Sequence, residues 1–261
     1  MTTLARILPL PGSGSRAVRV LERNGLVVRR TWWVLLSGFF EPLFYLLGLG
    51  FGLGAIVGDI DGIPYAMFVA PALMATSAMN GAVYDATFNL FYKLKYAHTY
   101  DAMLATPMAP QDVAHGEVAW ALIRGLMYSA AFLVIMLLLG LVATPLGLLA
   151  VPASVLIGFA AAGVAAAATT YVRSWQDFDL VFVVTTPLFL FSATFYPITT
   201  YPEPLRTLVE LTPLYRGVHM IRALTTDQLD AMVAVDVVYL AVLGLVGLAI
   251  TTRRMGKLLL K

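Results

Sequence analysis

Long apolar segments alternate with shorter polar segments along most of the chain. Because about 20 consecutive apolar residues are needed for a helix to cross the hydrocarbon core of a bilayer, this pattern predicts six membrane spans. The predicted spans are residues 31–52, 64–83, 118–140, 146–171, 178–197 and 232–252. The expected fold class is therefore an all-α integral membrane protein with six transmembrane helices.

The composition agrees with this fold class. Of the 261 residues, 60% are hydrophobic and only 12% are charged, whereas a soluble domain has about 45–50% apolar and about 25% charged residues. The chain has no cysteine, which excludes disulfides, cysteine-ligated zinc and a thiol nucleophile. A net charge of +2 gives no indication of a nucleic-acid partner.

The basic residues predict the orientation of the spans. All but three of the 17 Lys and Arg residues lie before the first span, near the segments after the second and fourth spans, or after the sixth span. An even number of spans places both termini on one side, and the positive-inside rule makes that side cytoplasmic. The three exceptions are Arg206, Arg216 and Arg222.

The predicted organisation has three parts. Residues 1–30 form a cytoplasmic N-terminal segment, 31–252 the transmembrane domain and 253–261 a basic cytoplasmic tail. The N-terminal apolar stretch LARILPLP is short and is followed by arginines rather than by a cleavage site, so we expect it to be retained.

An amphipathic helix is expected over residues 16–30. Arg16, Arg19 and Arg23 recur at helical spacing opposite apolar residues, which is typical of a helix that lies on the cytoplasmic membrane surface. The Asn24-Gly25 pair predicts a break or bend. Two interpretations remain open, an electrostatic anchor to anionic lipid and a docking element for a cytoplasmic partner.

Two loops are long enough to contain structure of their own. The polar loop 84–117 is expected to hold a short helix between two bends on the cytoplasmic side. The loop 196–231 has apolar residues at helical period, which predicts two short amphipathic helices, 203–211 and 213–224, dipping toward the outer leaflet before the sixth span.

The first span contains the unusual run FFEPLFYLLGLGFGLG (39–54). Its glycines are spaced four apart on two interleaved faces, and residues 160–168 of the fourth span are nearly all small, so close helix packing is expected at both places. Pro42 should kink or end the helix. Glu41 lies about 15 Å along the span, where a carboxylate must be neutral, paired or facing water. A structural role is favoured for Glu41, and proton coupling is the alternative.

Common catalytic motifs are missing. The sequence contains no GxxxxGK[ST], HExxH or GxSxG pattern, and we expect no catalytic residue and no bound metal. The polar residues of the loop 84–117 match no metal-ligand spacing and are interpreted as a solvated face. These are His98, Asp101, Asp112, His115 and Glu117.

Three stretches carry a resemblance to a known family. They are FEPLFYLLGLGFGLG (40–54), TYDAMLATPMAPQDVAHGEVAWALIRG (99–125) and SATFYPITTYPEPLRTLVELTPLYRGVHMIRAL (192–224). With six spans in order, the chain resembles the type-2 ATP-binding-cassette (ABC-2) export permeases, and among them the NodJ-like lipo-oligosaccharide and drug exporters. It departs from many relatives at Ala193, where they carry glycine.

The resemblance implies a partner and a coupling site. A permease of this family takes its energy from a separate ATPase subunit, present in two copies, which holds ATP and Mg, while the permease chain itself binds no cofactor. The loop 99–117 is similar to the coupling helix that rests on that ATPase. Its tip would be Ala105, Thr106 and Pro107, and its flanks Tyr100, Asp101 and Glu117.

The resemblance also implies how the chain assembles. The helix bearing Arg16, Arg19 and Arg23 would be the connecting helix that touches the same partner. Two copies of the chain would face each other, and residues of the first and fifth spans would line the cargo path. The expected lining residues are Glu41, Phe44, Phe191, Thr194 and Phe195, with ordinary helix packing as the alternative for each.

The expected function is therefore ATP-driven export of an amphipathic cargo, such as a glycolipid, lipo-oligosaccharide or drug, across the bacterial inner membrane. Membrane lipid is an expected partner and nucleic acid is not. A secondary transporter is the first alternative, although the second half shows no break to match Pro42, as an inverted repeat would require. A non-transporting membrane assembly protein is the other.

Overall fold

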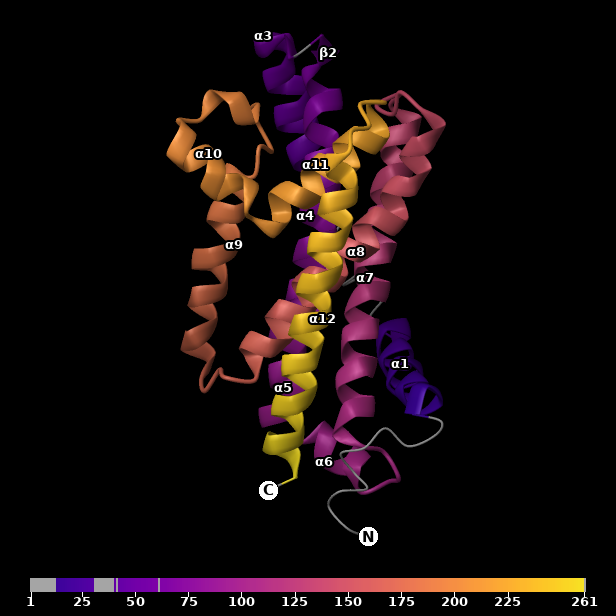
Figure 1. The fold of residues 1–261 in the computed structure, drawn as a ribbon. Coiled ribbons are helices and arrows are strands. Elements are labelled where there is room, and N and C mark those ends of the chain that lie inside the picture. Colours follow the sequence, from indigo (N-terminus) through magenta and orange to yellow (C-terminus); the bar gives the residue numbers. More distant parts are fainter. Residues whose placement is uncertain (1–12, 31–39, 41, 61, 261) are drawn as a thin grey trace.

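The computed structural model describes residues 13–30, 40, 42–60 and 62–260, and nearly all of them are helical (Figure 1). The only strands within this part of the chain, β1 (Asp59–Ile60) and β2 (Ile63–Pro64), form a two-residue antiparallel hairpin. The all-α fold class is confirmed. The helices are α1 (Ser13–Arg30), η2 (Leu46–Leu53), α3 (Gly54–Val57), α4 (Tyr65–Tyr84), η3 (Asp85–Asn89), α5 (Leu90–Lys95), α6 (Thr99–Leu104), α7 (Pro110–Leu138), η4 (Pro145–Leu149), α8 (Ala150–Thr169), η5 (Trp175–Phe178), α9 (Asp179–Phe191), η6 (Ile198–Thr200), α10 (Glu203–Glu210), α11 (Pro213–Thr225) and α12 (Met232–Leu259).

Four helical segments of the described chain are long and apolar enough to cross a membrane, namely Tyr65–Lys95, Pro110–Leu138, Pro145–Thr169 and Met232–Leu259. They correspond to the second, third, fourth and sixth predicted spans. The first predicted span is described only from residue 40 onward and without Glu41; its described helix, Pro42–Val57, is shorter.

The fifth predicted span, 178–197, is shorter than expected. Helix α9 has 13 residues, a length of about 20 Å, against about 30 Å of hydrocarbon. The helix ends at Phe191 because Ala193 adopts a left-handed backbone with φ 55°. The hydroxyl of Thr194 then donates to the carbonyl of Phe189, 2.8 Å away.

The second span is longer than the sequence pattern indicated. The helix does not stop near residue 83 but continues through η3 and α5 to Lys95. The polar residues that suggested a loop are paired with other parts of the chain. Asp85 forms an ion pair with Arg124, and Lys93 with Glu117.

The closest helix contact lies between α8 and α12. A Cβ atom built on Gly247 would lie 2.3 Å from the carbonyl carbon of Gly163, and one on Gly163 would lie 2.7 Å from the carbonyl oxygen of Gly244. Only glycine permits this approach, so the packing role predicted for the small residues at 160–168 is confirmed.

Only one glycine face of the first apolar helix packs in this way. Gly50 faces Ala66, and Gly54 faces Tyr65, both in α4. At Gly48, an added Cβ would meet nothing within 4 Å in the described chain. The predicted packing is therefore found on the Gly50 and Gly54 face, while the Gly48 face is open.

The helices give the molecule two distinct ends. One end holds α6, the C-terminal end of α12, and α1, which packs on the lower part of α7 (Figure 1). The α10–α11 hairpin and β2 lie toward the other end. The predicted outer helices 203–211 and 213–224 correspond closely to α10 and α11. Between α9 and helices α4, α8 and α12 lies an apolar cavity of about 600 Å³.

We predict that Ala193→Gly stabilises the protein. Removing the strain of an alanine in the left-handed conformation stabilises the folded state by about 1–2 kcal/mol. The greater chain entropy of glycine in the unfolded state opposes this by about 0.5–1 kcal/mol. The free energy of unfolding should therefore rise by about 0.5–1 kcal/mol. Equilibrium unfolding in mixed micelles measures the change. The same substitution within a helix, Ala168→Gly, should act in the opposite direction. A loss of stability at position 193 would show that packing of the Ala193 methyl outweighs backbone strain.

Candidate coupling site

Helix α6 forms a short projection between α5 and α7. It begins after His98, which has a left-handed backbone (φ 46°), and it ends where the Thr106 hydroxyl donates to the carbonyl of Met103 (2.6 Å). The next helix, α7, begins at Pro110, and the backbone N–H of Ala109 donates to the Asp112 carboxylate (2.9 Å). The short helix expected in this loop is therefore present and has defined bends on both sides.

One side of α6 is anchored and the other is free. The ring of Tyr100 is 1% exposed and packs with Val113 and Met255 from α7 and α12. Burial, together with the negative charge of Glu117, raises the pKa of Tyr100 well above its ordinary value of 10. Asp101 lies on the exposed side, where it pairs with His98 at 2.9 Å.

The predicted tip residues Ala105, Thr106 and Pro107 are all exposed. Because α6 is anchored through Tyr100, these residues project from a fixed base rather than from a loose loop. The structure therefore places an exposed surface at the end of the molecule where basic residues gather.

Helix α1 packs against α7 beside this projection. The side chain of Val20 is fully buried against Gly116, where an added Cβ would lie 2.5 Å from the Val20 Cβ. Arg16 donates to the carbonyl of Pro107 (2.8 Å), so α1 contacts the tip directly. The helix is continuous at Asn24 and Gly25, and the break predicted there is wrong.

The other two arginines predicted in the connecting helix have local partners. Arg19 pairs with Glu22 at 2.7 Å on the exposed surface, and Arg23 donates to Asn24 (3.2 Å). Of the three, Arg16 therefore makes the contact with the tip.

A buried polar network joins α1, α5 and α7. The Lys93 ammonium lies 2.6 Å from Glu117, whose carboxylate also accepts from the Asn24 amide (3.2 Å), and Lys93 donates to the Asn24 oxygen (3.1 Å). Gly116 and Glu117 thus have complementary roles. Glycine lets α1 approach α7, and glutamate fixes α1 and α5 to the place of contact.

A second ion pair lies deeper in the bundle. Asp85, in the widened turn of η3, is 2.6 Å from the guanidinium of Arg124 in α7, and Asn89 donates to the other oxygen of Asp85. The solvated face predicted for the polar residues of this loop is wrong for Asp112 and Glu117, which are both buried. In the described chain, no group of three potential ligands is arranged to hold a metal.

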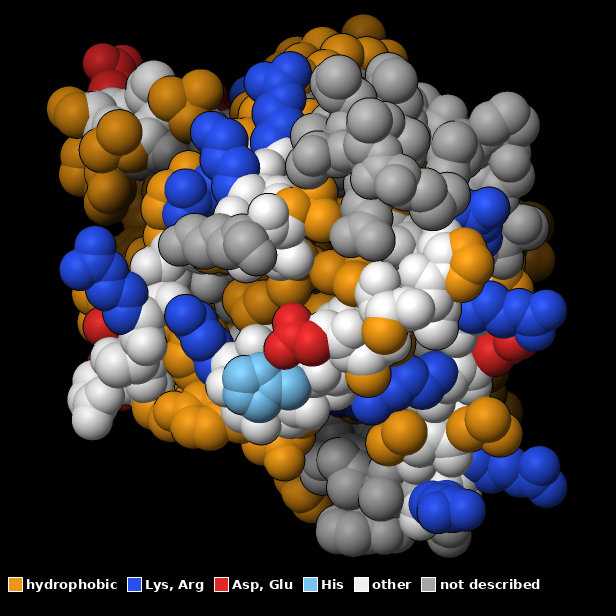
Figure 2. Space-filling view, turned by 90° about the horizontal axis from the view of Figure 1, so that it is seen from below, with side chains coloured by type: hydrophobic (Ala, Val, Ile, Leu, Met, Phe, Trp, Pro, Cys, Tyr) orange, Lys and Arg blue, Asp and Glu red, His pale blue; other side chains and the backbone are white. Residues whose placement is uncertain are grey.

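The end of the molecule that carries α6 is basic. Figure 2 shows Lys and Arg side chains spread over this face, with few acidic side chains between them. A basic surface at the ends of apolar helices is the arrangement that the positive-inside rule associates with the cytoplasm.

A second cavity, of about 490 Å³, lies between the first apolar helix, α4 and α9. Aromatic rings form much of its wall, including Tyr45, Phe182 and Phe189, and the polar groups of Thr76 and Asn80 also line it. Sequence reasoning missed the α4 residues. The signal that could have identified them is Asn80, because a carboxamide within a predicted span is unusual.

The residues predicted to line a cargo path are spread around this region. Phe44 and Phe191 are exposed, and Phe44 stacks on Phe40 with 5.9 Å between ring centroids. Thr194 is buried, and Phe195 packs edge-on against Phe189 at 5.2 Å. Glu41 lies outside the described residues.

Comparison with known proteins identifies the class of this chain. The family model for "ABC-2 type transporter" matches residues 17–226, which include most of α1, helix α6, the helices that line the second cavity and the α10–α11 hairpin. The chain belongs to the ABC-2 transporter family. It is a multi-pass, non-catalytic permease subunit, and membership implies that a partner ATP-binding-cassette subunit handles ATP.

Among its relatives, the chain is 32% identical over 232 residues to "Nodulation protein J" of Sinorhizobium fredii, covering 87% of this chain and 88% of the relative. It is 29% identical over 255 residues to "Nodulation protein J" of Rhizobium leguminosarum bv. viciae, covering 95% and 98%. It is 25% identical over 184 residues to "Inner membrane transport permease YadH" of Escherichia coli, covering 65% and 66%. The chain is therefore similar to NodJ permeases over most of its length.

We predict that Glu117→Leu destabilises the protein by about 3–5 kcal/mol, because it leaves the buried Lys93 ammonium without its counterion. Equilibrium unfolding in mixed micelles measures the loss. Adding Lys93→Met should recover most of it, since the uncompensated charge is then removed. The matched control Glu22→Leu, at an exposed pair, should change stability by less than about 0.5 kcal/mol. Equal effects at positions 117 and 22 would contradict the network.

Proposed function

We propose that this protein is the membrane subunit of an ATP-driven exporter and moves an amphipathic cargo outward across the bacterial inner membrane. The observation that carries the proposal is the exposed tip of α6 on a base that is anchored to α7 and α12. Such a projection suits the transfer of force from a separate motor. Both termini would lie in the cytoplasm with the basic face, where the ATPase binds.

The contacts of α6 suggest a route for that force. Tyr100 connects α6 to α7 and α12, and Arg16 connects the tip to α1. The network around Glu117 then connects α1 and α7 to α5, which is continuous with α4. ATP binding that closes two ATPase subunits would displace α6 in each of two permease copies and tilt these helices together.

The mixed character of the second cavity supports an amphipathic cargo. Aromatic rings offer apolar surface, while Thr76 and Asn80 offer hydrogen-bonding groups. Phe44 and Phe191 are exposed, and each lies close in sequence to an aromatic residue that lines this cavity; they are the proposed lining residues of the path, together with Glu41. The resemblance of the sequence to lipo-oligosaccharide exporters agrees with such a cargo.

The first test is co-purification. The chain, tagged at its C-terminus, is extracted from its own membranes in mild detergent or in native lipid particles, and the stoichiometry of the complex is measured. Two copies of the permease with two copies of a nucleotide-binding protein would support the exporter. A clean complex without an ATPase, in both preparations, would overturn it and favour an ion-coupled transporter, with Glu41 as the next residue to test.

We predict that Thr106→Arg uncouples the complex while leaving the fold intact. A long charged side chain at the exposed tip should obstruct docking of α6 on the ATPase and reduce cargo-stimulated ATP hydrolysis at least about tenfold, or about 1.4 kcal/mol. Purified complex in lipid nanodiscs gives the measurement. Thr200→Arg, an equally exposed threonine in η6 at the opposite end, is the matched control and should keep full stimulation. If Thr106→Arg retains full stimulation, the proposed role of the tip is wrong.

A further inference from the structure

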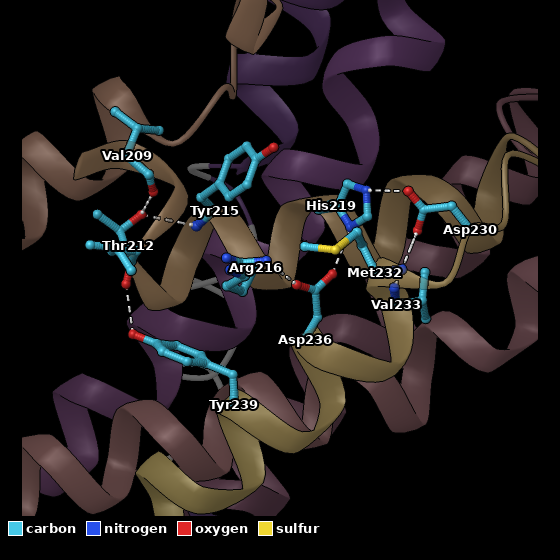
Figure 3. Close-up of polar contacts among 11 residues, drawn as sticks. Val209, Thr212, Tyr215, Arg216, His219, Asp230, Met232, Val233, Asp236 and Tyr239 are labelled. Carbon is cyan, nitrogen blue, oxygen red and sulfur yellow. Dashed lines mark hydrogen bonds and ion pairs between the residues drawn. The ribbon is translucent and has the colours of Figure 1, made fainter. Parts of the chain in front are cut away.

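A cluster of charged residues lies at the other end of the molecule, where the α10–α11 hairpin meets the beginning of α12 (Figure 3). His219 projects from α11 between two carboxylates. Its Nδ1 is 2.6 Å from Asp236 in α12, and its Nε2 is 3.5 Å from Asp230 in the segment before α12. Each nitrogen of one imidazole ring therefore faces an acidic group.

The two carboxylates are fixed in place. Asp236 is fully buried, and its other oxygen lies 3.2 Å from Arg216, one helical turn before His219. Asp230 caps α12 by accepting from the backbone N–H groups of Met232 (3.0 Å) and Val233 (3.2 Å). Through Asp236 and Asp230, His219 is therefore connected to the first two turns of α12.

These contacts form most of the polar attachment between the hairpin and α12. The other attachment drawn in Figure 3 is the Tyr239 hydroxyl, which donates to the carbonyl of Leu211 at the α10–α11 junction (2.6 Å). Arg216 and His219 both hold Asp236, so removal of one leaves the buried carboxylate with a partner. The hairpin can thus lose one of its contacts with α12 while the others remain.

The protonation state of the His219 imidazole determines how many of these contacts it can make. A neutral ring donates from one nitrogen only, whereas the protonated ring donates from both. Only the protonated form can donate to Asp236 and Asp230 together. Its side chain is 28% exposed, so a proton can reach it from solvent.

We propose that His219 is a proton-binding site that sets how firmly the α10–α11 hairpin is held on α12. When His219 is protonated, it joins the hairpin to Asp236 and Asp230. When it is neutral, it donates to Asp236 alone, the contact with Asp230 is lost, and the hairpin is held by that one hydrogen bond together with Arg216 and Tyr239. The proposal concerns the attachment of the hairpin and holds whether or not an ATPase drives the protein.

The surroundings of His219 set the sign of the pH dependence. The hydrogen bond to Asp236 raises its pKa above the ordinary value of 6.5, aided by the charges of Asp236 and Asp230 and opposed by burial and by Arg222. On its own helix, Arg216 and the stacked ring of Tyr215 also lie close. Because its pKa is higher in the attached state, the extra attachment is complete below pH 6.5 and is lost as the pH rises through the raised value.

Other elements packed against α11 add little charge. Helices α4 and α8 and the turn η4 contain no Asp, Glu, Lys, Arg or His. In α10, Arg206 pairs with Glu210 at 2.9 Å, and Glu203 lies in the first turn; in α9, Asp179 lies in the first turn, away from the hairpin. His219 is therefore the group at this junction whose ordinary pKa lies closest to neutral pH.

The absence of cysteine makes a direct test possible. Leu208→Cys in α10 and Val238→Cys in α12, at positions 64% and 62% exposed, introduce two spin labels into the full-length chain. Double electron–electron resonance in lipid nanodiscs then measures the distance between hairpin and α12. We expect one narrow distance at pH 5.5 and a broader distribution at pH 8.5, with a midpoint above pH 6.5.

Variants identify the group responsible. With His219→Gln, the distribution should be broad at both pH values, while folding is retained because Arg216 still pairs with Asp236. His98→Gln, which alters an exposed histidine paired with Asp101 at the opposite end, should keep the pH response. A distance distribution that does not change with pH in the parent protein, or that still changes with pH in His219→Gln, would overturn the proposal.

Discussion

The structure depends on one constraint, which is that apolar helices in lipid gain little from burying apolar surface against one another. Close approach of small residues and pairing of polar groups must hold such helices together instead. Both are present here. The glycines of α8 and α12 bring two backbones into contact, and buried ion pairs connect η3 and α5 to α7.

The placement of these interactions divides the molecule into regions with different tasks. The pairs Lys93–Glu117 and Asp85–Arg124 lie toward the end that carries α6, and the cluster around Asp236 lies at the other end. Two cavities lie beside α9, and none of the residues of that helix is buried. The two ends are therefore fixed by buried charges, whereas the middle of the molecule beside α9 contains open space.

Much of this architecture could be predicted from the sequence because hydropathy and helical period reflect local physics. The bounds of α10 and α11 agree closely with prediction, and the small residues of α8 pack as expected. Prediction failed where a distant partner changes the meaning of a residue. Asp85 and Lys93 suggest a loop until Arg124 and Glu117 are known to face them, and Asn24 suggests a break until its amide is found against Glu117.

The continuous helix from Tyr65 to Lys95 has a mechanical consequence. Its 31 residues make a rod of about 46 Å at about 1.5 Å per residue. One end lies beside α6, and at the other end the Tyr65 hydroxyl donates to the carbonyl of Phe195 (3.1 Å). Such a rod acts as a lever. A tilt of about 5° around its middle moves the two ends by about 2 Å in opposite directions. A push at the basic end therefore becomes an opposite displacement where α9 leads toward the α10–α11 hairpin.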